Sequence, residues 1–221
     1  MNSENIKQAL APFGLKLRGI AALSPDEKQV YGFTANTVAL VGNIGSSFWP
    51  VFRQSREYAD GKANPLDRWS LRLAKQIAPR LNATPVFPFQ GPPYLPFQQW
   101  AKRAETLQQS PIGLMMHPQY GLWHAYRFGL LLTEPIASTI VQQDSPCLSC
   151  SEQPCLNTCP VNAFSDSGYD IARCAQYLQQ TSATDCARHG CMARYECPAG
   201  RNYRYIDEQS QFHLQTFLSA G

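Results

Sequence analysis

The sequence predicts an α/β domain followed by a small α+β domain rich in cysteine. Apolar segments of strand length alternate with amphipathic helical segments over roughly the first 140 residues. All eight cysteines come later, beginning with Cys147. The 17 prolines and 14 glycines predict many turns, which a helical bundle would not need. We therefore expect one domain over residues 1–140 and a second over 141–221, with the boundary inside residues 134–146.

Helices are predicted where apolar residues recur every three or four positions. Residues 4–13 form a short segment of this kind, and residues 97–107 form another. The clearest helix covers residues 65–81, where Asn64 is expected to cap the first turn and Pro65 suits its first position. One face of that helix carries Leu66, Trp69, Leu73, Ile77 and Leu81.

Strands are predicted in shorter apolar segments with alternating or continuous hydrophobicity. These segments cover residues 15–21, 37–41, 84–89, 112–116 and 122–132. The turn sequence at 117–121 suggests that the last two strands form a hairpin. On the final strand, alternation places Leu122, His124, Tyr126 and Phe128 on one face, and Trp123, Ala125, Arg127 and Gly129 on the other.

Charge is distributed unevenly along the chain, whose formal net charge is +3. Up to residue 140 there are 14 Lys and Arg against 8 Asp and Glu, and from residue 141 there are 5 against 8. The two parts therefore carry net charges of +6 and −3. The difference could simply reflect two unlike surfaces, or the basic part could attract an anionic ligand while the acidic part meets an electron donor. No basic segment followed by an apolar run opens the chain, and no apolar run reaches about 18 residues. We expect a cytoplasmic protein that does not enter a membrane, with reduced thiols.

The cysteines form a pattern typical of iron–sulfur ligands. The first four follow the spacing C-x2-C-x4-C-x3-C-P, which is two residues longer at its middle gap than the ferredoxin run C-x2-C-x2-C-x3-C-P. Each cluster requires four soft thiolate ligands, so eight cysteines suffice for two [4Fe–4S] clusters. The alternatives are two zinc sites or disulfides, but zinc favours two C-x2-C pairs and the chain has one.

The expected ligand sets are crossed in sequence, because the fourth cysteine of a ferredoxin run binds the other cluster. One set is Cys147, Cys150, Cys155 and Cys197, and the other is Cys159, Cys174, Cys186 and Cys191.

Residues at about 110–200 resemble a known family. The segment from His117 to Pro135, HPQYGLWHAYRFGLLLTEP, is similar to the strand that leads into the family's cluster motif, and Arg173-Cys174 resembles its isolated ligand. The family is that of epoxyqueuosine reductase and related iron–sulfur, cobalamin-dependent reductases. The resemblance implies a nitroreductase-like, three-layer α/β domain packed on a dicluster ferredoxin-like domain, with cobalamin as a candidate third cofactor. The first half of the chain is also distantly similar to cobalamin-processing proteins of the same fold.

Two departures from the family limit what the resemblance implies. The family's general-acid aspartate would fall near residues 90–93, where the sequence has no carboxylate, and the repeat region that relatives use for transfer RNA has no counterpart before Gly221. We therefore expect neither epoxyqueuosine reduction nor a nucleic-acid partner. The candidate cofactor-binding residues are His117, Trp123, His124, Tyr126 and Arg127, each of which could equally serve core packing, a structural hydrogen bond or an ion pair.

These observations together predict an iron–sulfur redox protein. Electrons from a donor such as a ferredoxin, a flavodoxin or a reductase would pass through the clusters to a small-molecule or corrinoid ligand held by the first domain. A reductase is the leading interpretation. The alternative is a non-enzymatic protein that transfers electrons or handles cobalamin.

Overall fold

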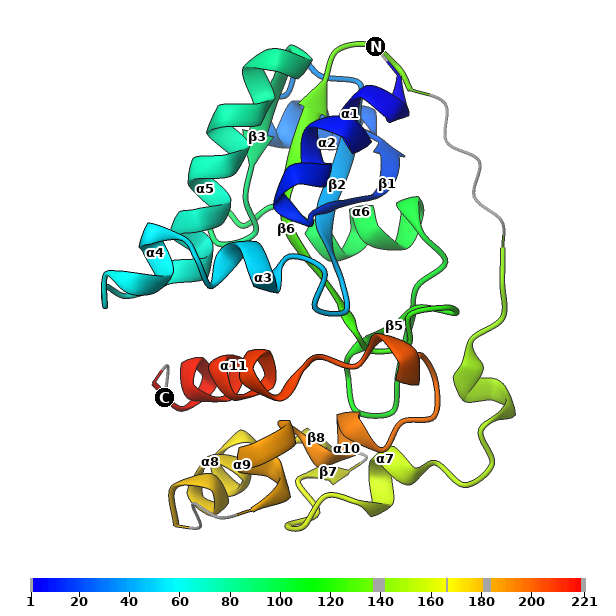
Figure 1. Cartoon of the computed structure of the whole chain (residues 1–221). Coiled ribbons are helices and arrows are strands. Elements are labelled where there is room, and N and C mark those ends of the chain that lie inside the picture. Colours follow the sequence, from blue (N-terminus) through cyan, green and yellow to red (C-terminus); the bar gives the residue numbers. More distant parts are fainter. Residues whose placement is uncertain (1, 137–141, 166, 181–183, 220–221) are drawn as a thin grey trace. The chain divides into compact units, whose positions relative to one another are not determined.

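The chain divides into two compact units (Figure 1). The computed structural model describes residues 2–136, 142–165, 167–180 and 184–219. The first unit comprises Met1–Thr106 and Ala125–Gln142, and the second comprises Leu107–His124 and Gln143–Gly221. The boundary expected at residue 140 lies outside the described residues, and the 1–140 and 141–221 division stays a prediction.

The first unit is built on a four-stranded sheet of order β1-β2-β6-β3. Strand β1 pairs antiparallel with β2, and β3 pairs antiparallel with β6. The strands cover Lys16–Ala22 (β1), Thr37–Ile44 (β2), Ala83–Val86 (β3) and His124–Leu132 (β6). All four strands were predicted from the sequence, with ends that coincide or are shifted by up to three residues.

Strand β2 is covered on both faces. Its residues from Thr37 to Asn43 are all buried, and consecutive side chains of a strand point to opposite faces of the sheet. Helix α6 (Phe97–Ala104) lies close to one face. A Cβ atom on Gly19 of β1 would stand 2.7 Å from the Ala104 carbonyl oxygen, so only glycine permits this approach. The unit is thus a mixed α/β structure, as the sequence predicts.

The helices of the first unit include the three that the sequence predicts. Residues 4–13 form α1 (Ser3–Leu10) and a 3-10 turn (Ala11–Phe13), and residues 65–81 form α5 (Pro65–Ile77) with a second 3-10 turn (Ala78–Leu81). The remaining helices are α2 (Pro25–Tyr31), α3 (Trp49–Phe52) and α4 (Arg56–Ala59).

Helix α2 lies in a segment for which the sequence pattern predicts neither a helix nor a strand. The Ser24 side chain accepts a hydrogen bond from the Glu27 N–H, and the Glu27 side chain accepts one from the Ser24 N–H. This reciprocal capping box marks a helix start, and Pro25 suits the first position. The Ser-x-x-Glu spacing was therefore a readable signal for this helix.

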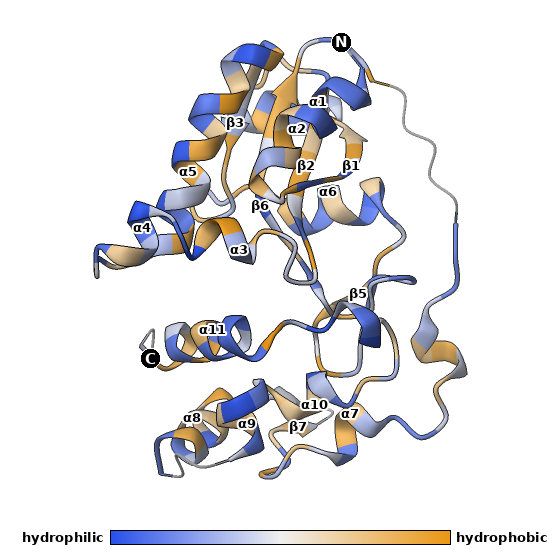
Figure 2. Ribbon diagram, viewed as in Figure 1, coloured by the Kyte–Doolittle hydropathy of each residue, from blue (hydrophilic) through white to orange (hydrophobic). Residues whose placement is uncertain are grey.

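Helix α5 packs its apolar face into an aromatic core. The rings of Trp69 and Phe48 lie 5.7 Å apart, and those of Trp69 and Phe52 lie 5.5 Å apart. Figure 2 shows hydrophobic and hydrophilic residues alternating along the ribbon of α5. The expected side-chain cap from Asn64 is wrong, because Asn64 adopts a left-handed conformation (φ 51°) and its side chain makes no capping bond.

The second unit consists mainly of short helices joined by loops. Its strands are β4 (Gln108–Gln109), β5 (Met115–Met116), β7 (Phe164–Ser165) and β8 (Gly168–Tyr169). Its helices are η3 (Pro146–Ser149), α7 (Pro154–Asn157), α8 (Ile171–Gln180), α9 (Asp185–His189), α10 (Met192–Tyr195), η4 (Arg201–Tyr203) and α11 (Asp207–Ser219). Cys174 lies on α8.

The segment at residues 107–124 belongs to the second unit rather than to the first. Ile112, Met116 and Leu122 are buried in one cluster with Cys155 and Cys197. The hairpin predicted between residues 112–116 and 122–132 is wrong, because β5 pairs with β4 while β6 joins the sheet of the first unit. The turn at residues 117–121 does form, closed by a bridge between its first and last residues.

The part of the chain that the structure describes contains no helix with the length and apolar character needed to cross a membrane.

Candidate functional site

Four cysteines line one cavity of the second unit, which we call the first cysteine cavity. The cavity has a volume of about 280 Å³, and its lining includes Cys147, Cys150, Cys155 and Cys197. Helix η3 carries the first of these residues and α7 the third, while the last follows α10 by two positions. Residues about 50 positions apart in the sequence thus face one space.

The other four cysteines line a separate cavity, which we call the second cysteine cavity. Its volume is about 250 Å³, and its lining includes Cys159, Cys174, Cys186 and Cys191. Helix α8 presents one of these thiols and α9 another, and Cys191 is the residue directly before α10. The eight thiols are therefore divided four and four between the two cavities.

The electrostatics of the thiols follow the same division. Burial raises the pKa of the Cys155 thiol above its ordinary value, and the negative charges of Cys197, Cys147 and Cys150 raise it further. Burial likewise raises the pKa of the Cys186 thiol, to which Cys174 and Cys159 add.

Each cavity thus gathers thiols whose charged forms repel one another. Without a bound cation, the buried thiols would stay protonated near neutral pH, so binding of a metal would release protons.

The thiols surround spaces larger than one ion. Among the residues described, no three Cys, His, Asp or Glu side chains lie close enough together to hold a single metal ion. One thiol of the second cysteine cavity accepts a backbone hydrogen bond: the N–H of Ala163 donates to Sγ of Cys159 at 3.3 Å. Such N–H···S bonds are one means by which a protein adjusts the reduction potential of a thiolate-bound cluster.

An arginine that sequence reasoning missed forms part of the second cavity's wall. The guanidinium of Arg194 lies 4.5 Å from the ring centroid of Trp123 and 4.5 Å from that of Tyr205. Its Nη2 donates a hydrogen bond to the carbonyl oxygen of Leu122. The positive charge of Arg194 therefore lines the same cavity as the four thiols, between two aromatic rings. No local sequence pattern indicates this position.

Of the five candidate cofactor-binding residues, Trp123 lines a cysteine cavity, while the two histidines hold the turn at residues 117–121. Nδ1 of His117 accepts hydrogen bonds from the N–H groups of Gln119 and Tyr120, at 3.0 and 3.2 Å. Nε2 of His124 lies 3.0 Å from the carbonyl oxygen of Met115. Both rings therefore have structural partners within the second unit.

The other two candidates, Tyr126 and Arg127, belong to the first unit. The Tyr126 hydroxyl donates a hydrogen bond to Glu105, whose other oxygen accepts one from Nε of Arg18 at 3.2 Å. This ion pair is deeply buried, since the Arg18 side chain is 0% and the Glu105 side chain 9% exposed. Arg127 lies over the ring of Phe48, 5.9 Å from its centroid. The five candidates are thus divided between the two units, and their cofactor-binding roles stay predictions.

Comparison with known proteins places the chain in a fold class but in no family. No protein-family model matches the sequence, and no curated protein matches it. Together with the sheet and its covering helices, the similarity to one solved structure with a TM-score of 0.52 defines a protein of the mixed α/β class.

Two solved structures are similar to this chain. One is the crystal structure of the C. elegans B12-trafficking protein CblC, a homologue of human MMACHC, with 13% sequence identity and a TM-score of 0.52 over 97% of this chain and 93% of that chain. The other is epoxyqueuosine reductase with an epoxyqueuosine-modified tRNA-Tyr stem loop, with 16% identity and a TM-score of 0.47 over 93% of this chain. This chain spans about 60% of the length of that reductase. At 13% identity the similarity to CblC is one of fold alone.

Proposed function

We propose that the second unit holds two [4Fe–4S] clusters and that the chain is an iron–sulfur redox protein. The first cluster is assigned to Cys147, Cys150, Cys155 and Cys197, and the second to Cys159, Cys174, Cys186 and Cys191. The observation that carries the proposal is the division of the eight thiols between two cavities, four to each. A cubane cluster needs four thiolates around a group larger than one ion, whereas tetrahedral zinc draws its four ligands to a single point.

The clusters would supply one-electron transfer, and the residues around them would adjust it. The Ala163 N–H and the Arg194 guanidinium both favour added negative charge on the second cluster, so they would make it easier to reduce. The electrons would come from a protein donor and reach a cofactor or substrate held by the first unit, which makes a reductase the leading function. A carrier that only transfers electrons is the alternative.

Two double variants test the assignment of ligands. After anaerobic reconstitution, the wild-type chain is expected to hold about eight irons, and each lost cluster removes about four. If the sets are crossed as proposed, Cys147→Ser/Cys197→Ser removes one cluster and leaves about four irons. Cys147→Ser/Cys159→Ser removes a ligand from each cluster and leaves close to none.

The opposite pattern, with about four irons left in Cys147→Ser/Cys159→Ser, would show that the two ligand sets follow sequence order. A colourless wild-type protein that binds about two zinc ions would refute the clusters altogether. Electron paramagnetic resonance of the reduced protein distinguishes one cluster from two interacting clusters.

We propose cobalamin as the first cofactor to test with the cluster-loaded protein. The fold shared with a B12-trafficking protein supports this choice. Visible spectra recorded while cobalamins, and separately flavins, are added to the reconstituted chain would report binding. A reductase predicts that the bound cofactor is reduced once the clusters are reduced, whereas a cobalamin-handling protein predicts binding without reduction. No spectral change with either cofactor would rule out both.

A further inference from the structure

A polar hollow on the first unit lies between α4 and α5 and is separate from both cysteine cavities. It has a volume of about 570 Å³, and its lining includes five cations. These are Arg56, Lys62, Arg68, Arg72 and Lys75. We propose that this hollow, which we call the basic hollow, binds a small ligand that carries two or more linked phosphate groups.

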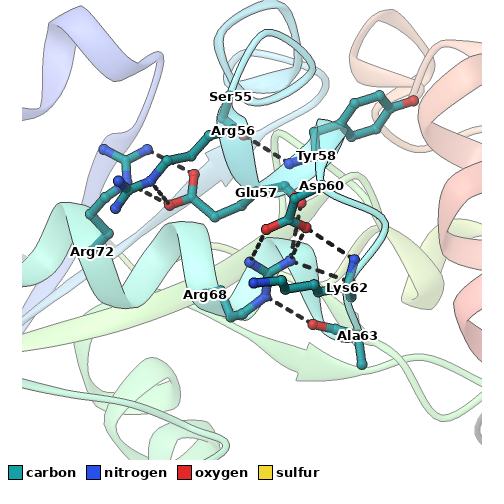
Figure 3. A network of polar contacts seen from close by, with 9 residues as sticks. All are labelled: Ser55, Arg56, Glu57, Tyr58, Asp60, Lys62, Ala63, Arg68 and Arg72. Carbon is teal, nitrogen blue, oxygen red and sulfur yellow. Dashed lines mark hydrogen bonds and ion pairs between the residues drawn. The ribbon is translucent and has the colours of Figure 1, made fainter.

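The charge in the basic hollow is not balanced by its own carboxylates. Five cations face the two carboxylates of Glu57 and Asp60, which leaves a surplus of three positive charges. Figure 3 shows that both carboxylates are already engaged by arginines. Asp60 accepts hydrogen bonds from both terminal nitrogens of Arg68 at 2.7 Å. A ligand with several negative charges would neutralise what remains.

Glu57 holds two of the arginines in place. Its side chain is 5% exposed and accepts hydrogen bonds from Nε and Nη2 of Arg72, at 2.6 and 2.9 Å, and from Nε of Arg56 at 3.2 Å. Nη1 of Arg72 and both terminal nitrogens of Arg56 make no hydrogen bond within the described residues. Because two hydrogen bonds to Glu57 already orient the Arg72 guanidinium, binding an anion there would cost little side-chain entropy.

Arg68 serves a different purpose, because it holds the loop that carries Lys62. It donates hydrogen bonds to the carbonyl oxygens of Ala63, Glu57 and Lys62 in addition to its pair with Asp60. The ammonium groups of Lys62 and Lys75 have no ion-pair partner in the part of the chain that the structure describes. The loop and α5 therefore present two unneutralised ammonium groups to the hollow.

The spacing of the cations along α5 favours a chain of phosphates over a single one. Arg68, Arg72 and Lys75 are four and three residues apart, so they lie on one face of the helix. At a rise of about 1.5 Å per residue they cover about 10 Å of the helix axis. Arginine forks match phosphate oxygens, and lysines add point charges. Leu71 is the one apolar residue in the lining, so the hollow offers no flat apolar wall to a nucleobase.

The test is the binding of inorganic pyrophosphate to the full chain at low ionic strength, measured by isothermal titration calorimetry. Lys62→Gln/Lys75→Gln removes two positive charges that no ion pair uses, so the fold should be retained. We expect affinity to fall about fivefold to thirtyfold, as for the loss of two exposed charge pairs. Lys16→Gln/Lys102→Gln makes the same change of charge on exposed residues elsewhere in the unit and should alter affinity less than twofold.

Other ligands identify the source of the phosphates. Binding that strengthens from phosphate to pyrophosphate to tripolyphosphate supports the proposal. Affinity for ADP equal to that for pyrophosphate identifies a bare phosphate chain, and tighter binding of ADP identifies a nucleotide.

Three results would overturn the proposal. They are the absence of pyrophosphate binding, an equal loss of affinity in the two double variants, and an RNA stem that binds the hollow without being displaced by pyrophosphate. None of these measurements depends on the iron–sulfur clusters, so the two proposals stand or fall separately.

Discussion

Replacing Glu57 by Gln should destabilise the first unit in a pH-dependent way. The carboxylate is almost fully buried between Arg72 and Arg56 (Figure 3). The hydrogen bonds from Arg72 foremost, and from Arg56 in addition, lower the pKa of Glu57 from 4.5 to about 2. Glutamine has nearly the same shape but no charge, so the variant isolates the contribution of the ion pairs.

The magnitude follows from the pKa difference. A difference of about 2.5 in pKa corresponds to a ceiling of about 3 kcal/mol in the free energy of unfolding. The Arg72 side chain is 33% exposed, so solvent screens part of the interaction and we expect a loss of about 2 kcal/mol at pH 7. Because the folded-state pKa lies below the unfolded one, this stabilisation is complete above the unfolded value and is lost as the pH falls towards 2.

Urea unfolding followed by tryptophan fluorescence measures this effect, since Trp49 and Trp69 lie in the core beside α4 and α5. The difference between wild type and Glu57→Gln should narrow by about 40% between pH 7 and pH 3.5. Glu4→Gln is the matched control, because Glu4 pairs with Lys7 on the surface and should contribute within about 0.5 kcal/mol. A difference that stayed the same at both pH values would refute the electrostatic explanation and indicate a packing effect instead.

Three further predictions concern the buried ion pair, the wall of the first cysteine cavity and the metal. Glu105→Gln leaves the fully buried Arg18 without its counter-charge, so it should lower the free energy of unfolding by about 3 kcal/mol in urea titrations. A loss below about 1 kcal/mol would contradict a stabilising role for this buried ion pair. Gly121→Ala places a Cβ atom 2.1 Å from the Ala199 carbonyl oxygen at a positive φ of 58°, so it should reduce iron retention in the second unit. Gly113→Ala also has a positive φ but meets no atom within 4 Å, so its smaller effect on bound iron is the control. Removing iron from the reconstituted chain with a chelator should increase amide hydrogen exchange in α8 to α11, while the exchange of β1 and β2 changes little. Adding iron and sulfide back should restore the protection of α8 to α11. An equal increase of exchange in both units would argue against a second unit that depends on metal for its fold.

Much of the first unit could be predicted from the sequence because its elements are amphipathic or continuously apolar over a short range. Helix α5 and strand β2 are clear examples, since the three- and four-residue spacing of Leu66, Trp69 and Leu73 and the apolar run at residues 37–41 are local signals. Helix α2 was missed although Ser24 and Glu27 carry the capping-box spacing. The predicted hairpin was wrong because a turn fixes the direction of the chain but not the sheet that the next strand joins.

For the candidate site, too, local sequence patterns did not reveal which distant residues come into contact. The cysteine spacing predicts two sets of four, and the structure lines two cavities with those sets. The candidate cofactor-binding residues at 117–127 were selected by residue type, and strand alternation assigned four of them to a face of the strand. Alternation assigns a side chain to a face but does not reveal its partner, so the contacts of Tyr126 with Glu105 and of Trp123 with Arg194 were not foreseen.

The sequence by itself determined the residue types and local elements of this protein: the cysteine run from Cys147, the excess of basic residues before residue 140, and the periodicity of the main helices and strands. The tertiary structure decided which distant residues meet. It brought Cys197 beside Cys155, enclosed the Arg18 and Glu105 pair, and gathered the cations of α4 and α5 around one hollow. The physical reason is that spacing along a helix or strand is set by backbone geometry within a few residues, whereas contacts between distant segments depend on how the whole chain packs.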